Sequence, residues 1–178
     1  GAAWWGLGEM SRAADAWYRA LRHLDRIGAV ITQRRMLTNL IDAHVRHGDY
    51  EQARELLARC EALGGADDPD TRIRRVPLQL AEARYDDALA TLDAMLPSSD
   101  RLGEEAAVHR GAALVGLDRP AEALAVLEPL FARGTWFDST MQALALEHAA
   151  AAHGDLGQCD QALALLDEAL ATLPSDHP

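Results

Sequence analysis

Apolar residues recur at helical spacing along nearly the whole chain. The clearest example follows Gly48 and Asp49, a pair that is typical of a tight turn. From Tyr50 onward the apolar residues lie three or four positions apart, which places them on one face of a helix. The run 36–47 before the turn has the same spacing. The pattern therefore predicts a helix, a two-residue turn and a second helix.

This helix–turn–helix unit recurs along the sequence. Each second helix carries a small residue near its start, where another helix has to come close, and we use it to align the repeats. These residues are Ala13, Ala53, Ala88, Ala123 and Ala162, which are 40, 35, 35 and 39 positions apart. A bulky apolar residue follows four positions after each: Trp17, Leu57, Leu92, Leu127 and Leu166. The sequence thus predicts an array of similar helix pairs.

The array resembles the tetratricopeptide repeat (TPR), a unit of about 34 residues that consists of two antiparallel helices. The resemblance covers nearly the whole chain in four full repeats and a half. The last repeat matches best, with Gly157, Ala162, Leu166, Ala169 and Pro174 at the positions of the family motif. The resemblance implies an all-α fold, a right-handed α-solenoid of antiparallel helix pairs with about nine to ten helices.

We expect one repeat domain over residues 1–178. Its repeats are predicted at about 1–28, 29–65, 66–98, 99–134 and 135–174, and residues 175–178 are predicted to be a frayed tail. The third repeat departs from the family, because Ala83 replaces the turn glycine and Pro77 falls inside the first helix. Since proline lacks a backbone N–H, we expect that helix to kink or to restart near Pro77.

Turn residues and proline predict where several helices begin and end. We expect helices over 10–27, 29–47, 50–63, 85–96, 101–117 and 158–173, and one that ends near Gly154. Asp70 or Thr71 is predicted to cap the helix of Pro77, and Ser98, Ser99 or Asp100 to cap the helix over 101–117. Pro120 is predicted to occupy the first turn of its helix, where the missing N–H costs little.

Composition narrows the class of protein. Hydrophobic residues make up 49 % of the chain but aromatic residues only 5 %, which suits closely packed helices. Apolar runs fall short of the roughly 18 residues that a membrane span needs. The formal net charge is −11, and arginine supplies all 17 cations. An acidic chain is a poor binder of nucleic acid, and the exclusive use of arginine favours a GC-rich bacterial genome. We therefore expect neither direct nucleic-acid binding nor a membrane protein.

Candidate chemistry is sparse. Cys60 and Cys159 lie far apart at repeat positions that other repeats fill with core residues, so we expect two buried thiols in a reducing, cytoplasmic compartment. His44 and His47 have a spacing that can hold a metal but lack a third ligand nearby. His44 and His153 precede turns at the same repeat position, which favours a role in helix packing. With no zinc, phosphate-loop or nucleophile motif, we predict no metal, no cofactor and no enzymatic activity.

The family resemblance implies a concave groove, lined mainly by the first helix of each repeat, that typically binds a peptide or an extended segment of a partner. Its predicted lining is Arg35, Thr38, Asp42, Ile73, Arg74, Leu80, Glu105, Val108, Ala112, Leu144, Glu147 and Ala151. The plain alternative is that these residues are only solvated. The family's grip on a peptide carboxylate is expected to be missing, because lysine is absent and Asn39 is the only asparagine.

The first functional hypothesis is a non-catalytic scaffold that binds a protein or peptide in this groove. A second is a ligand- or partner-sensing segment of a larger bacterial regulator of the transcription-activator type. It draws on the expectation that the chain, which opens at Gly1 inside a predicted helix, is an excised piece. A third is self-assembly, with a homodimer formed through Trp4 and Trp5 at the N-terminal end of the array.

Overall fold

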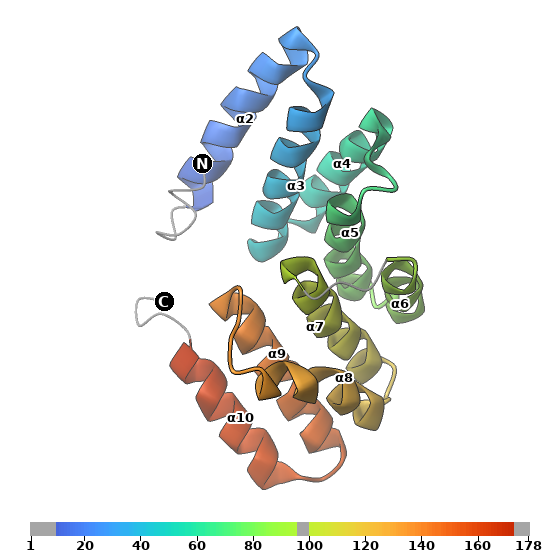
Figure 1. The fold of residues 1–178 in the computed structure, drawn as a ribbon, viewed down its shortest axis with the longest axis vertical. Coiled ribbons are helices and arrows are strands. Elements are labelled where there is room, and N and C mark those ends of the chain that lie inside the picture. Colours follow the sequence, from blue (N-terminus) through green and yellow to red (C-terminus); the bar gives the residue numbers. More distant parts are fainter. Residues whose placement is uncertain (1–9, 96–99, 173–178) are drawn as a thin grey trace. The chain divides into compact units, whose positions relative to one another are not determined.

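The computed structural model describes residues 10–95 and 100–172, and most of these residues lie in helices and none in a strand (Figure 1). Nine α-helices and one short π-helix (η1) occur in this part of the chain. In order they are α2 (Met10–Ile27), α3 (Val30–Arg46), α4 (Tyr50–Cys60), η1 (Glu61–Gly65), α5 (Pro69–Ala81), α6 (Tyr85–Asp93), α7 (Arg101–Gly116), α8 (Pro120–Ala132), α9 (Ser139–Asp155) and α10 (Cys159–Thr172). The all-α prediction is confirmed.

The chain divides into two compact units, residues 1–81 and 82–178. We call them the N-terminal unit, which includes α2 to α5, and the C-terminal unit, which includes α6 to α10. A continuous array in one domain and its repeat boundaries stay predictions, as does the right-handed sense of the solenoid. None of the helices in the described ranges combines the length and apolar character that crossing a membrane requires.

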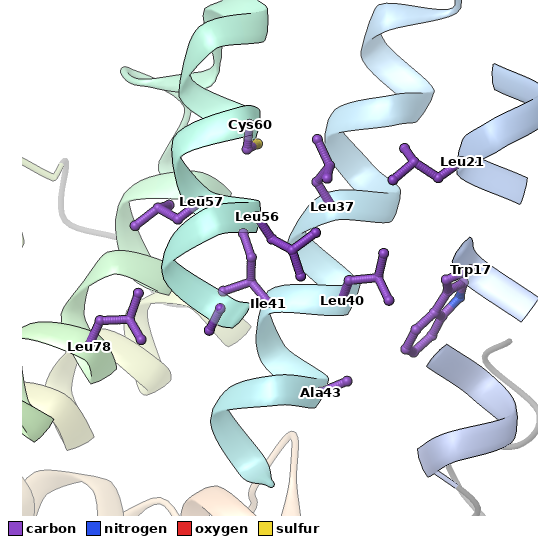
Figure 2. Packing of buried hydrophobic residues seen from close by; sticks show 11 residues of the cluster. Trp17, Leu21, Leu37, Leu40, Ile41, Ala43, Leu56, Leu57, Cys60 and Leu78 are labelled. Carbon is purple, nitrogen blue, oxygen red and sulfur yellow. The ribbon is translucent and has the colours of Figure 1, made fainter. Parts of the chain in front are cut away.

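The core of the N-terminal unit lies between α2, α3 and α4, and α5 packs against α3 and α4. Figure 2 shows Trp17 and Leu21 of α2 pointing toward Leu37 and Leu40 of α3. Leu37 and Leu40 have no exposed surface, and complete burial of such a side chain stabilises a fold by about 1.5–3 kcal/mol. The helical spacing of the apolar residues thus places them in a shared core, as predicted.

In the C-terminal unit α7 is the central helix, since α6, α8 and α9 all pack against it, while α10 packs on α9. The aligned alanines at Ala88 and Ala123 are fully buried, as is Leu127. A Cβ atom at Gly111 would lie 2.7 Å from the Leu127 side chain. Glycine at this position therefore lets α7 come close to α8.

The turns within the helix pairs share one backbone geometry. Gly48, Ala83, Asp118 and Gly157 each have a positive φ, between 55° and 76°. After Gly48, Asp118 and Gly157 the next N–H donates to a carbonyl five residues back, as from Asp49 to His44 at 2.9 Å and from Gln158 to His153 at 2.8 Å. This pairing satisfies carbonyls at the end of the first helix. The helix–turn–helix repeat is thereby confirmed at the backbone level.

The prediction that the helix restarts near Pro77 is wrong, because α5 runs from Pro69 through Pro77 to Ala81, while a kink at Pro77 stays a prediction. The neighbours Val76 and Leu78 are buried, and their packing holds the turn in which Pro77 lacks an N–H. The two residues predicted to cap this helix, Asp70 and Thr71, do not cap it. The Asp68 carboxylate accepts from the Asp70 N–H at 3.0 Å, whereas the Thr71 side chain is fully buried.

Other helix ends agree with the sequence to within a few residues. Asp100 caps α7 by accepting from two backbone N–H groups, and Pro120 opens α8, as predicted. Helix α4 ends at Cys60, three residues early, and gives way to η1, in which Gly64 has a φ of 77°. Helix α6 also ends early, at Asp93. The predicted tail at 175–178 and the Trp4–Trp5 pair lie outside the described residues.

Candidate functional site

Three of the predicted groove residues share the outward face of α3. Arg35, Thr38 and Asp42 are spaced i, i+3 and i+7, opposite the buried Leu37 and Leu40. Arg35 is exposed and the other two are half-buried. The Thr38 hydroxyl donates to the Arg35 carbonyl at 3.0 Å, and the Asp42 carboxylate lies 3.5 Å from Arg46 Nε. The face is therefore polar, locally ordered and accessible.

On α5 the predicted residues differ in exposure. Ile73 is fully buried, whereas Arg74 and Leu80 are half-buried. The arginines beside Arg74 are held by acids of the same unit. Arg72 lies 2.6 Å from Asp67, and Arg75 lies 2.6 Å from Glu61. This pairing offsets much of the positive charge that Arg72 and Arg75 bring to α5.

The predicted residues of α7 are mostly buried. Glu105 is 5 % exposed and Val108 is not exposed at all, while Ala112 is half-buried. The reason is the central place of α7, which three helices cover. The Glu105 carboxylate lies 2.7 Å from Arg101 Nη1, so its charge is paired within the helix. These side chains support the core of the C-terminal unit.

Helix α9 presents an accessible face in the C-terminal unit. Glu147 and Ala151 are exposed and Leu144 is half-buried, all on the side opposite the buried Ala145 and Ala149. These three residues have the same i, i+3 and i+7 spacing as the outward face of α3. Each unit thus carries one accessible face among the predicted groove residues, on α3 and on α9.

Sequence reasoning missed a pocket in the C-terminal unit. It is a partly open cavity of about 380 Å³ between α8, α9 and α10, and its lining residues are Phe131, Gly134, Trp136, Ser139, Gln142 and Glu168. The Phe131 and Trp136 rings lie 5.9 Å apart at 47°. The cavity combines two aromatic walls with a carboxylate and an amide. The only sequence signal was an aromatic residue just after the break at Gly134.

A buried carboxylate fixes the connection that forms one wall of this pocket. Glu104, 2 % exposed on α7, accepts from Arg133 Nη2 at 2.7 Å and from the Phe137 N–H at 3.2 Å. Asp138 then accepts from the Thr140 N–H at 2.7 Å and caps α9. Three hydrogen bonds thereby hold the segment on either side of Trp136, so the ring position is set by the core.

The histidines near the turns have a structural role. The His44 ring nitrogens lie 2.8 Å from the Tyr18 hydroxyl and 3.1 Å from an Asp49 carboxylate oxygen. His153 Nδ1 lies 2.5 Å from Gln158 Oε1. In both cases the partner is five residues on, just beyond the turn. Among the residues that the structure describes, no three His, Cys, Asp or Glu side chains group so as to hold a metal ion.

The two cysteines differ. Cys60 is buried, as predicted, and its sulfur lies 3.3 Å from the Thr71 hydroxyl. Burial raises the pKa of the Cys60 thiol, which keeps it protonated and unreactive. The prediction of a buried thiol is wrong for Cys159, which is exposed at the start of α10. Tyr50, the first residue of α4 and the equivalent of Cys159 in its repeat, is exposed as well, so this position faces outward.

Comparison with known proteins supports the fold. No family model and no curated protein matches the sequence. Two solved structures resemble the chain, each over 96 % of its length. One holds the nearly identical TPR-like repeats of a candidate kinesin light chain from Podosopora anserina (TM-score 0.62, 16 % identity, 89 % of that chain). The other is MamA from MSR-1 (TM-score 0.55, 19 % identity, 95 % of that chain).

Together with the helix pairs and their shared turn, these likenesses define the class of fold. The protein has a TPR-like fold, an all-helical repeat architecture, as the sequence predicted. Both identities are low, so the likeness concerns the fold alone. What the chain binds has to be argued from its own surfaces.

Proposed function

We propose that the protein is a non-catalytic repeat scaffold that binds segments of another protein, one on the outward face of α3 and one, separately, on the outward face of α9. The observation that carries this proposal is the row of Arg35, Thr38 and Asp42. These side chains are accessible on a helix whose opposite side is packed into the core. A TPR-like array provides such a surface because the first helix of each repeat packs against its neighbours and leaves one side accessible.

The chemistry of the two faces indicates the kind of segment. The α3 face offers a guanidinium and a carboxylate, while the α9 face offers the Glu147 carboxylate beside the small Ala151. A segment with side chains of both charges would complement the α3 face, and a segment with a basic and a small apolar side chain would complement the α9 face. Ile73, Glu105 and Val108, which are buried, position the helices instead.

The wider context belongs to the same proposal. We place the protein in the cytoplasm because Cys60 and Cys159 are both free thiols, which a reducing compartment maintains. We propose a protein partner rather than a nucleic acid, because the net charge of −11 repels phosphates. The bacterial origin and the right-handed solenoid remain part of the proposal as well.

A pull-down from the source cells tests the proposal, with mass spectrometry as the readout. The variant Arg35→Ala, Asp42→Ala, Glu147→Ala should lose a partner that the unaltered protein retains. A matched control is Arg54→Ala, Glu51→Ala, Glu128→Ala, which removes the same charges from exposed positions elsewhere. If the two variants retain the same partners as the unaltered chain, the outward faces are not the binding site.

The pocket favours a second candidate, a ligand-sensing segment of a larger regulator. Phe131, Trp136 and Glu168 line one cavity, and two rings with a carboxylate suit a small organic cation. Calorimetric titration with a panel of organic cations should detect binding that Trp136→Leu abolishes. Phe137→Leu is the matched control, because Phe137 is adjacent but 61 % exposed. Equal loss in both variants, or no binding by any cation, would remove this candidate.

A further inference from the structure

Exposed large apolar side chains gather at two places. Of the nine among the described residues, six form two clusters. Ile27, Val30 and Ile31, at the turn between α2 and α3, are 62 %, 41 % and 71 % exposed, and we call them the isoleucine patch. Leu163, Leu166 and Leu170 of α10 are 62 %, 41 % and 70 % exposed, and we call them the leucine stripe. Contiguous exposed apolar surface marks an interaction site more often than single residues do.

The leucine stripe lies where the other repeats are covered by a helix. Leu57, Leu92 and Leu127 occupy the same repeat position as Leu166, and they are 7 %, 3 % and 0 % exposed. In each of those repeats the second helix packs against the helix that follows it. Helix α10 packs mainly on α9, and Leu163, Leu166 and Leu170 line its opposite side at i, i+3 and i+7.

The surroundings of the two surfaces are opposite in charge. From residue 134 to the end the sequence has seven acids and no lysine or arginine. Asp160 and Asp167, both exposed, border the leucine stripe. By contrast, the exposed Arg19, Arg22 and Arg26 follow one another along the outer side of α2 toward the isoleucine patch.

The charge of the two units shows the same asymmetry. The N-terminal unit has 12 arginines and 11 acids, a net charge of +1, whereas the C-terminal unit has 5 arginines and 17 acids, a net charge of −12. The basic surface beside the isoleucine patch is therefore drawn to the acidic surface beside the leucine stripe of another molecule. This attraction increases the rate at which the two surfaces meet.

We propose that the isoleucine patch of one molecule docks on the leucine stripe of a second copy of this chain. The contact joins two different surfaces, so it is heterologous. Each pair leaves one isoleucine patch and one leucine stripe unoccupied, and association continues beyond the dimer. The contact involves neither Trp4 and Trp5 nor the partner-binding residues of α3 and α9, and does not depend on them.

Sedimentation velocity over a concentration series tests the proposal. A patch variant carries Ile27→Gln and Ile31→Gln, and a stripe variant carries Leu163→Gln and Leu170→Gln. All four side chains are more than 60 % exposed, so their replacement removes little core packing. Circular dichroism checks that both variants are folded. Glutamine keeps the charge of each surface, which isolates the apolar part of the contact.

The unaltered protein should form species larger than a dimer as concentration rises, and added salt should weaken them. Each variant alone should stay monomeric. An equal mixture should give a complex of one molecule of each that grows no further, because the stripe variant keeps its patch and the patch variant keeps its stripe.

Four results would overturn the proposal. The unaltered protein could stay monomeric at every concentration, or its association could be independent of salt. Either variant could still associate by itself, or the mixture of the two variants could stay monomeric. The first two need no variant, so they decide the matter even if a variant fails to fold.

Discussion

At the scale of single residues, Glu104 is a carboxylate that is almost completely buried in the C-terminal unit. Its buried carboxylate accepts from Arg133 and from the Phe137 N–H. Glu104→Gln keeps the shape and one acceptor but removes the charge that Arg133 faces. We expect it to lower the free energy of unfolding by about 1–2 kcal/mol, as measured by urea denaturation.

The control for this prediction is Glu122→Gln. Glu122 also pairs with an arginine, since its carboxylate lies 2.6 Å from Arg119 Nη2, but the pair is exposed. Water screens such a pair, so the substitution should change stability far less. Equal effects at both positions would mean that burial does not set the importance of Glu104.

His148 on α9 predicts a pH dependence. Burial lowers the pKa of His148 below its ordinary value of 6.5, and the neighbouring Glu147 opposes this only in part. Between the folded-state and the unfolded-state pKa the unfolded chain therefore binds more protons. The free energy of unfolding should fall as the pH drops below 6.5, and the loss is complete below the folded-state pKa.

Urea denaturation at pH values above and below 6.5 tests this, with His148→Gln beside the unaltered protein. The variant lacks the titrating group, so its stability relative to the unaltered chain should improve as the pH falls. A constant difference between the two proteins across this range would show that His148 contributes nothing to the pH dependence.

At the scale of elements, the turn within each helix pair requires a left-handed residue. Ala83 occupies this position with a φ of 55°, where glycine is free of the steric cost that a Cβ imposes. Ala83→Gly should therefore raise the free energy of unfolding by up to about 1 kcal/mol, less what the more flexible unfolded chain recovers. Thermal and urea unfolding both measure this.

Ala90→Gly is the matched control, because Ala90 is also exposed but lies inside α6 with ordinary helical geometry. There glycine should lower stability by about 1 kcal/mol. The two substitutions are chemically identical, but their expected effects on the free energy of unfolding are opposite in sign. Destabilisation by both would contradict the role assigned to the Ala83 turn.

The elements also show how far local sequence rules reach. Spacing and turn residues predicted where most helices lie, because each helix buries one regular stripe. They failed at Pro77, where proline argued for a break and the burial of Val76 and Leu78 prevailed. The cap was misplaced for a similar reason. Threonine is a good capping residue, but the side chain of Thr71 is buried between α4 and α5, where its hydroxyl lies next to the Cys60 sulfur.

At the scale of the whole molecule, burial decides which predicted site residues are accessible. Repeat spacing assigned Arg35 and Val108 to the same kind of position. The structure exposes Arg35 and buries Val108, although three α-helices pack against each of α3 and α7. Leu166 shows the converse. Its repeat position is buried at Leu57, Leu92 and Leu127, but no described helix follows α10 to cover Leu166. Repeat spacing alone carries no information about the number of neighbours.

The unequal charge of the two units predicts that salt stabilises them unequally. The C-terminal unit, with a net charge of −12, repels itself, and salt screens this repulsion, whereas the N-terminal unit is nearly neutral. In native-state hydrogen exchange on the dilute protein, added potassium chloride should slow exchange in α7 and α9 more than in α3 and α4. Asp160→Asn with Asp167→Asn should reduce the difference, since it removes two of the repelling charges. An equal change in both units would show that salt acts on the protein generally and that the charge asymmetry does not limit its stability.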